Sequence, residues 1–273
     1  MRKDSDRSDR NIQTVLEEYY GCYNTQKFIA SDPVSIVHEY SGKREREVVA
    51  ILVSSLAYGR VQSILNSSQD LLERLGGDPA DFLLRHNQRQ IEAACKGFRH
   101  RFTGQETIRN LLCGIKRILH GHSSLEHCMR SQICTSNNEL LPAINGFVEE
   151  LTGFREGIPH LFPAPRKGSA CKRLNLFFRW MVRDDAVDPG GWKQPDPKDL
   201  LIPLDVHMMR VCHLLGLTKR KNPDLKATLE VTAAFRKICP EDPVRYDFAL
   251  TRAAMLEGME SIAERFGRRT FRG

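Results

Sequence analysis

The stretch IPLDVHMMRVCHLLGL, residues 202–217, decides the fold prediction. It predicts a helix that begins near Pro203 and runs to Leu215, with Gly216 placed where a helix commonly ends. Asp205 lies at the start of this helix, where unpaired backbone N–H groups and the helix dipole favour an ionised carboxylate. The plainest interpretation of Asp205 is a helix cap, and a chemical role is the alternative.

A second helix start lies upstream, in GSACKRLNLFFRWMVR (168–183). The preceding stretch, 157–168, contains three prolines and is followed by a serine, which indicates a chain break and then a capping residue. Beyond it, apolar residues recur at helical spacing and predict a helix from Ala170 to Arg183. Lys172 therefore belongs to the first turns of this helix.

Two interpretations of Lys172 stay open. A lysine at a helix start is commonly solvated or bound to a phosphate of a nucleic-acid backbone. A nucleophilic lysine, in contrast, needs desolvation or a cationic neighbour that favours the neutral amine. Arg173 and Arg179 are close enough in the sequence to supply such a neighbour.

Helical spacing of apolar residues continues through most of the chain, and no strand alternation or internal repeat is visible. We predict an all-α protein with two helical subdomains that flank a cleft. Further helices are predicted at 12–29, 44–75, 79–95, 106–119, 224–238 and 243–256, a loop with a short helix at 121–140, and an irregular loop at 184–203. The expected parts are an N-terminal extension with the first helix (1–30), a helical domain (31–256, with subdomains at about 45–160 and at 161–256 plus the N-terminal part) and a basic C-terminal tail (257–273).

The bulk properties favour a nucleic-acid partner. The 273 residues carry a formal charge of +7 and the sequence pI is about 9.0, which suits a polyanion because each neutralised phosphate releases counterions. The eight cysteines are scattered and no secretory signal or membrane span is visible, so we expect reduced thiols, no membrane partner and a cytoplasmic location. No phosphate-binding glycine motif or metal-ligand spacing is present, and no cofactor or metal is expected.

The order of these motifs resembles a known superfamily. A break, a helix that carries KRLNLF from Lys172, a loop, and PLDVHMMRV from Pro203 together resemble the core of the helix-hairpin-helix DNA glycosylases, the endonuclease III and oxoguanine glycosylase superfamily. KGSACKRLNLFFRWMVR, LIPLDVHMMRV, LGLTKRK and CPEDPVRYDFAL also resemble a bacterial family of unknown function, over most of residues 30–255.

The superfamily resemblance implies base excision repair on damaged double-stranded DNA. Asp205 would stabilise positive charge at the sugar C1′ or orient the attacking group. Lys172 would attack C1′ and form a Schiff base, which gives a combined glycosylase and abasic-site lyase. If Lys172 is not the nucleophile, Asp205 would activate water in a monofunctional glycosylase. The alternative function is a non-catalytic, structure-specific nucleic-acid-binding protein on the same fold.

Three departures from the superfamily pattern bear on this choice. FPAPRKGS (162–169) replaces the usual glycine-rich hairpin. The interval of 33 residues from Lys172 to Asp205 is longer than usual, which makes Lys167 a second candidate nucleophile. Leu56 stands where a base-probing glutamine is common.

Basic, small and aromatic residues near these motifs are the expected DNA contacts. Trp192, in the Pro/Gly loop, is the preferred side chain for stacking on an extruded base. The full expected set is Tyr58, Arg60, Arg166, Lys167, Gly168, Ser169, Arg173, Trp192, His207, Arg210, Lys219, Arg220 and Lys221. The sequence identifies no protein partner.

Overall fold

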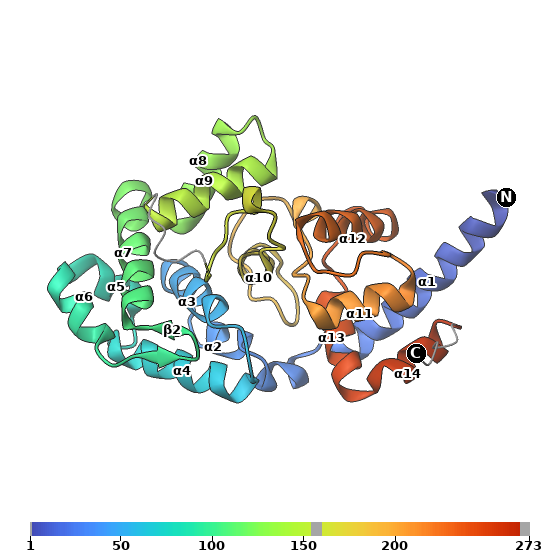
Figure 1. Ribbon diagram of the computed structural model, residues 1–273, viewed down its shortest axis with the longest axis horizontal. Coiled ribbons are helices and arrows are strands. Elements are labelled where there is room, and N and C mark those ends of the chain that lie inside the picture. Colours follow the sequence, from blue (N-terminus) through green and yellow to red (C-terminus); the bar gives the residue numbers. More distant parts are fainter. Residues whose placement is uncertain (1, 154–159, 268–273) are drawn as a thin grey trace.

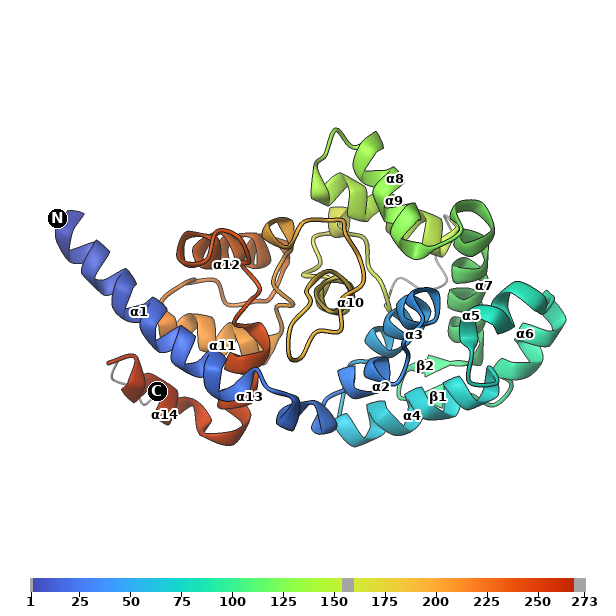
Figure 2. The same ribbon diagram turned by 180° about the vertical axis from the view of Figure 1, so that it is seen from behind.

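The computed structural model shows a chain built almost entirely from α-helices (Figures 1 and 2), and it describes residues 2–153 and 160–267, with side chains from residue 12 onward. The predicted all-α class is confirmed. The α-helices are α1 Arg2–Tyr23, α2 Val34–His38, α3 Lys43–Ser55, α4 Val61–Arg74, α5 Pro79–Arg85, α6 Gln88–Cys95, α7 Gln105–His122, α8 Leu125–Thr135, α9 Leu140–Thr152, α10 Lys172–Val182, α11 Val206–Leu215, α12 Leu225–Ile238, α13 Asp247–Leu256 and α14 Gly258–Arg265. The described part also contains three short 3-10 helices (η1 Gln26–Ser31, η2 Pro165–Lys167, η3 Pro197–Asp199) and one antiparallel hairpin (β1 Arg99–His100, β2 Thr103–Gly104). None of the helices within these limits is long and apolar enough to cross a membrane.

Local capping explains where several helices begin. Asp78 caps α5, and Ser124 caps α8. Asn87 and Gln90 form a reciprocal capping box at the start of α6. Asp224 caps α12 by accepting from the N–H of Ala227 at 2.7 Å. Each cap satisfies a backbone donor that the helix itself leaves unpaired, so the boundaries follow from short-range sequence.

Helix α10 lies at the centre of the molecule. In both views α4–α9 lie on one side of it, and α1 and α11–α14 lie on the other (Figures 1 and 2). α3 packs along α10, and α13 packs against both α1 and α11. The central helix is apolar on most of its surface, and Phe177 and Trp180 are fully buried. Such a helix must be covered on several faces.

Trp192 is part of this core, which makes its predicted role in base stacking wrong. Only 5% of its surface is exposed. Its ring packs edge-to-face on Phe177, with 5.2 Å between ring centroids. Its Nε1 donates to Glu47 Oε2 at 3.1 Å. The Pro/Gly loop that suggested exposure folds back along α10, so the indole gains apolar neighbours and a hydrogen-bond acceptor.

A buried ion-pair network ties α10 to the C-terminal side of the molecule. Arg179 pairs with Asp188 at 3.1 Å and also with Asp247. One turn further on, Arg183 pairs with Asp188 and, at 2.8 Å, with Asp242. Both guanidinium groups are almost fully buried. Their charges are balanced by these carboxylates, which makes the charged interior tolerable.

The chain ends differ from the prediction. α1 begins at Arg2, ten residues before the predicted start at 12. The predicted basic tail from residue 257 is wrong for residues 258–265, which form α14. Ile262 is fully buried, and Phe266 stacks on Tyr19 with 5.9 Å between centroids. The arginine content suggested a tail, but these apolar residues recur at helical spacing and dock the helix.

Two further segments are more ordered than expected. Residues 121–140 were expected to form a loop with a short helix, whereas α7 runs on to His122 and α8 covers Leu125–Thr135. A small two-stranded hairpin of β1 and β2 is also present, which no strand alternation in the sequence indicates. Each strand has only two residues, which is too short for a visible alternation.

Candidate functional site

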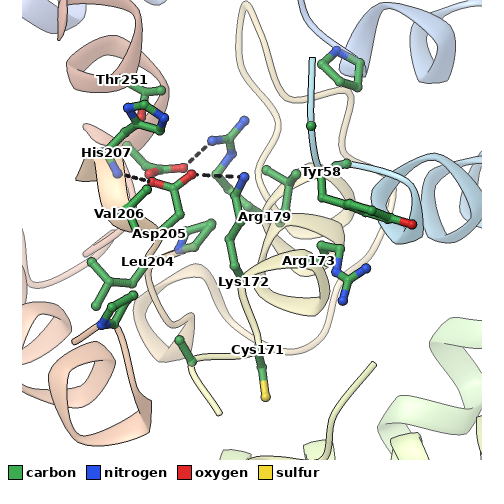
Figure 3. Close-up of a pocket in the computed structure, with 18 of the residues that line it drawn as sticks. Tyr58, Cys171, Lys172, Arg173, Arg179, Leu204, Asp205, Val206, His207 and Thr251 are labelled. Carbon is green, nitrogen blue, oxygen red and sulfur yellow. Dashed lines mark hydrogen bonds and ion pairs between the residues drawn. The ribbon is translucent and has the colours of Figure 1, made fainter. Parts of the chain in front are cut away.

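A cavity of about 930 Å³ opens beside the start of α10. Its wall combines the connection between α3 and α4, the segment before α10, the start of α11 and one face of α13. Both predicted subdomains therefore contribute to it. Figure 3 shows Lys172 and Asp205 pointing toward one another in this cavity, with Tyr58 and Arg173 on the other side of the lysine.

Lys172 and Asp205 form an ion pair in the cavity wall. Lys172 Nζ lies 3.1 Å from Asp205 Oδ2, and the two side chains are 34% and 25% exposed. The other carboxylate oxygen, Oδ1, accepts from the backbone N–H groups of His207 and Met208, each at 2.9 Å. The predicted cap at Asp205 is confirmed, and the same carboxylate contacts the lysine.

This environment keeps Asp205 ionised. Burial opposes ionisation, but the Lys172 ammonium and the two backbone donors outweigh it and lower the pKa of Asp205 below its ordinary value. A carboxylate held in this way can stabilise a positive charge that appears in the cavity. It is poorly suited to donating a proton.

The segment before α10 contains a turn at Gly168. Gly168 has a φ of +80°, a conformation that glycine adopts without strain. Its carbonyl accepts from the N–H of Leu225 at 2.9 Å, which joins this turn to the start of α12. Cys171, with a φ of +48°, precedes the first residue of α10. Gly168 and Ser169 line the cavity.

One face of α13 supplies cavity residues that were not predicted from the sequence. Asp247, Thr251 and Met255 are spaced by four residues and all line the cavity. Burial raises the pKa of Asp247 to about 6, although its contact with Arg179 opposes the shift. The sequence DFALTRAAM contained a signal for this face. Asp247 and Thr251 are polar residues four positions apart, so they share one face of a helix with apolar neighbours.

Arg173 is held against Tyr58. The guanidinium carbon lies 5.0 Å from the centre of the tyrosine ring. Arg173 also donates to the carbonyl oxygen of Ser55 at 3.1 Å and to that of His160. Both Tyr58 and Arg173 line the cavity, as does His160. Burial, together with Arg173, lowers the pKa of His160, so the imidazole is favoured in its neutral form.

The other predicted contact residues are distributed outside or at the edge of the cavity. His207 is exposed and lines it, whereas Lys167 is exposed and does not. Arg166 pairs with Glu149, and Arg220 pairs with Glu230 at 2.9 Å. Among the predicted contact residues, the exposed basic ones that do not line the cavity are Arg60, Arg166, Lys167, Arg210, Lys219, Arg220 and Lys221.

Leu56 is not available to a ligand. It is fully buried at the end of α3, whereas the next residues, Ala57 and Tyr58, line the cavity. Across residues 2–153 and 160–267, no three His, Cys, Asp or Glu side chains are grouped so that they could hold a metal ion.

The comparisons with known proteins give one result. The sequence model of a family described as "Protein of unknown function (DUF2400)" matches residues 32–256. No curated protein and no solved structure matches the chain. The matched range includes every residue of the cavity wall.

Proposed function

The chain belongs to the DUF2400 family of proteins of unknown function, and from its cavity we propose that it is a DNA glycosylase with abasic-site lyase activity. One observation carries the proposal: Lys172 and Asp205, 33 residues apart in the sequence, meet at 3.1 Å in the wall of a cavity of about 930 Å³. Each residue alone has an ordinary structural explanation. Their meeting in a cavity supports joint chemistry.

The cavity suits an extruded nucleotide. Ligand pockets commonly measure about 300–1,000 Å³, and enzymes that act on a base take the nucleotide out of the duplex into such a pocket. The wall offers Tyr58 and Phe248 as aromatic surfaces and Lys172 and Arg173 as cations. This mixture of apolar and cationic groups matches a base attached to a phosphodiester backbone.

The ion pair suggests an order of events. As the glycosidic bond breaks, its electron pair goes to the departing base, which takes a proton from the Lys172 ammonium. Asp205 stabilises the positive charge that appears at C1′. The neutral amine then forms a bond to C1′. Transfer of a proton from nitrogen to the ring oxygen, with cleavage of the C1′–O4′ bond, leaves a protonated Schiff base.

The likeness of LDVHMMRV and its position after the lysine helix to the helix-hairpin-helix glycosylases supports this proposal. The remodelled turn at Gly168 and the buried Leu56 favour the alternative, a structure-specific nucleic-acid-binding protein without chemistry. Lys167 is the weaker candidate nucleophile because it does not line the cavity.

Borohydride trapping tests the proposal. The purified protein is incubated with duplex DNA that carries an abasic site or an oxidised base, and borohydride reduces any Schiff base to a stable adduct. We expect an adduct with the wild type and with Lys167→Ala, and none with Lys172→Ala. Asp205→Asn should slow adduct formation roughly a hundredfold, the usual loss for one electrostatic group.

Each outcome has a distinct meaning. Loss of the adduct in Lys167→Ala alone would move the nucleophile. Base release without an adduct would indicate a monofunctional glycosylase in which Asp205 activates water. If neither an adduct nor base release appears on a panel of damaged duplexes, while binding persists, the binding protein is the correct function.

A further inference from the structure

The hairpin formed by β1 and β2 places an apolar side chain at the rim of the cavity. Phe102, at the turn of the hairpin, is 82% exposed. Burial of a phenylalanine side chain stabilises a folded protein, so a ring that stays exposed does not contribute this stabilisation. Phe102 lines the cavity that contains Lys172, and it also borders a second hollow of about 570 Å³ that is lined by residues of the hairpin and its flanks.

The base of this hairpin is firmly held, so the exposure of Phe102 does not result from a loose loop. His100 and Thr103 are almost fully buried. Tyr58 donates from its hydroxyl to the carbonyl oxygen of His100 at 2.8 Å. The His100 ring contacts the Ser67 hydroxyl at 2.9 Å and the carbonyl oxygen of Tyr58 at 3.1 Å. The hairpin therefore holds Phe102 in a well-defined position.

An unpaired cation lies beside the exposed ring, and Arg99 borders the same hollow as Phe102. The Arg101 guanidinium lies 5.7 Å from the centre of the Phe102 ring and 5.9 Å from that of Tyr58. Arg60 and Arg99 are also exposed. In the part of the chain that the structure describes, none of these three arginines forms an ion pair. An apolar ring among free cations suits a partner that combines phosphates with stacked rings.

We propose that Phe102 inserts into the base stack of duplex DNA at the position vacated by the nucleotide that enters the cavity. The inference rests on the proposed DNA partner. Extruding a nucleotide opens a gap in the stack, and proteins fill such gaps with apolar wedges that lower the cost of unstacking. Phe102 stands at the cavity rim, where this gap would lie, and Arg101 and Arg99 flank it on the same hairpin.

The test uses a short duplex with a tetrahydrofuran abasic analogue and a neighbouring 2-aminopurine, whose fluorescence rises when it is unstacked. With the wild type we expect binding and a fluorescence increase. Phe102→Ala should bind this duplex about tenfold more weakly and lose the increase, whereas its affinity for single-stranded DNA should change less than about twofold. Phe102→Trp should behave like the wild type. Leu229→Ala, which removes an exposed apolar side chain of α12 away from the cavity, is the matched control.

The readouts separate this inference from the proposed activity. If Phe102→Ala binds and unstacks the duplex as the wild type does, the proposed insertion of Phe102 is wrong. A Lys172-dependent adduct would then still support the proposed glycosylase activity. If Phe102-dependent unstacking occurs without adduct or base release, the wedge stands and the enzyme proposal fails. If the wild type binds no DNA, both are wrong. Because Phe102 is exposed, the melting temperatures of its variants should equal that of the wild type.

Discussion

At the residue scale, Asp205 combines a structural and a proposed chemical role that substitution can separate. Asparagine caps a helix about as well as aspartate, whereas alanine costs about 1 kcal/mol. We therefore expect Asp205→Asn to lower the free energy of unfolding by less than about 1 kcal/mol, because the ion pair with Lys172 is partly exposed. Asp205→Ala should lower it by roughly 1 kcal/mol more. Urea denaturation measures both.

The two Asp205 variants should differ in stability but not in activity. Both remove the negative charge, so both should lose most of the base release or adduct formation. If Asp205→Asn keeps wild-type activity, the carboxylate of Asp205 is only a cap, and the proposed chemistry is wrong.

Glu47 is a second carboxylate at which two effects oppose each other. It is fully buried on α3 and accepts from the N–H of Leu125 at 2.7 Å, from the N–H of Glu126 at 3.2 Å and from Trp192. Burial dominates over these donors and raises the pKa of Glu47 to about 7. The side chain thus joins α3, the start of α8 and the loop beside α10, and its charge state affects that junction.

The raised pKa of Glu47 predicts a pH dependence of stability. The folded protein holds the Glu47 proton more tightly than the unfolded chain does, so this contribution is fully present below about pH 4.5 and is lost as the pH rises through about 7. Glu47→Gln cannot titrate and should be the less stable protein. We expect the wild-type advantage in unfolding free energy to shrink by about 3 kcal/mol over this range. Urea denaturation at several pH values measures it, and an advantage that grows with pH would show that the hydrogen-bond donors dominate instead.

At the element scale, the sequence predicted the helix boundaries that local capping and helical spacing determine. The helices around Lys172 and Asp205 lie close to their predicted bounds because capping residues and helical spacing are local signals. The contact between Lys172 and Asp205 was anticipated only through a resemblance, since nothing in the spacing of 33 residues requires it.

Tertiary packing explains what the sequence did not predict. Trp192 lies in a Pro/Gly loop that reads as exposed, but the loop folds over α10 and buries the indole. Asp247 reaches the cavity because α13 packs against α11, a contact between segments with no shared motif. Phe102 escaped notice because a two-residue strand has no recognisable pattern. In each case the sequence does not show which side chains a neighbouring element buries and which it leaves accessible.

The packing of α7 against α9 gives a prediction that uses two glycines of one helix. A Cβ on Gly114 would lie 1.8 Å from the carbonyl oxygen of Leu151, whereas a Cβ on Gly121 would meet nothing within 4 Å. Alanine is favoured over glycine in a helix by about 1 kcal/mol. We expect Gly121→Ala to raise the unfolding free energy by roughly 0.5–1 kcal/mol. Gly114→Ala should lower it by about 1–3 kcal/mol, because the two helices must separate. Thermal denaturation compares them, and equal melting temperatures would contradict this account of the contact.

At the scale of the whole molecule, charge is arranged around the cavity in two layers. Inside, Arg179 and Arg183 are neutralised by buried aspartates and hold α10 to the C-terminal side. Next to lining residues of the cavity, Arg60 follows Gly59 and Arg101 precedes Phe102; both arginines are exposed and form no ion pair among the described residues. Only the second layer can exchange a solvent counterion for a phosphate. The net charge of +7 therefore says less about binding than the position of these free cations does.

If the protein binds DNA as proposed, this difference predicts which arginines control the salt dependence of that affinity. Each phosphate contact contributes about −0.9 to the slope of log affinity against log salt concentration. We expect Arg60→Ala and Arg101→Ala each to weaken the slope by about 1, through loss of one contact. Arg85→Ala is the control, because Arg85 is exposed but lies away from the cavity on α5 and pairs with Asp81 at 2.7 Å. Fluorescence anisotropy with an undamaged duplex across a salt series measures the slopes. A uniform effect of all three substitutions would mean that net charge, not the rim of the cavity, governs binding, and the wild-type slope itself gives the number of phosphates that this surface engages.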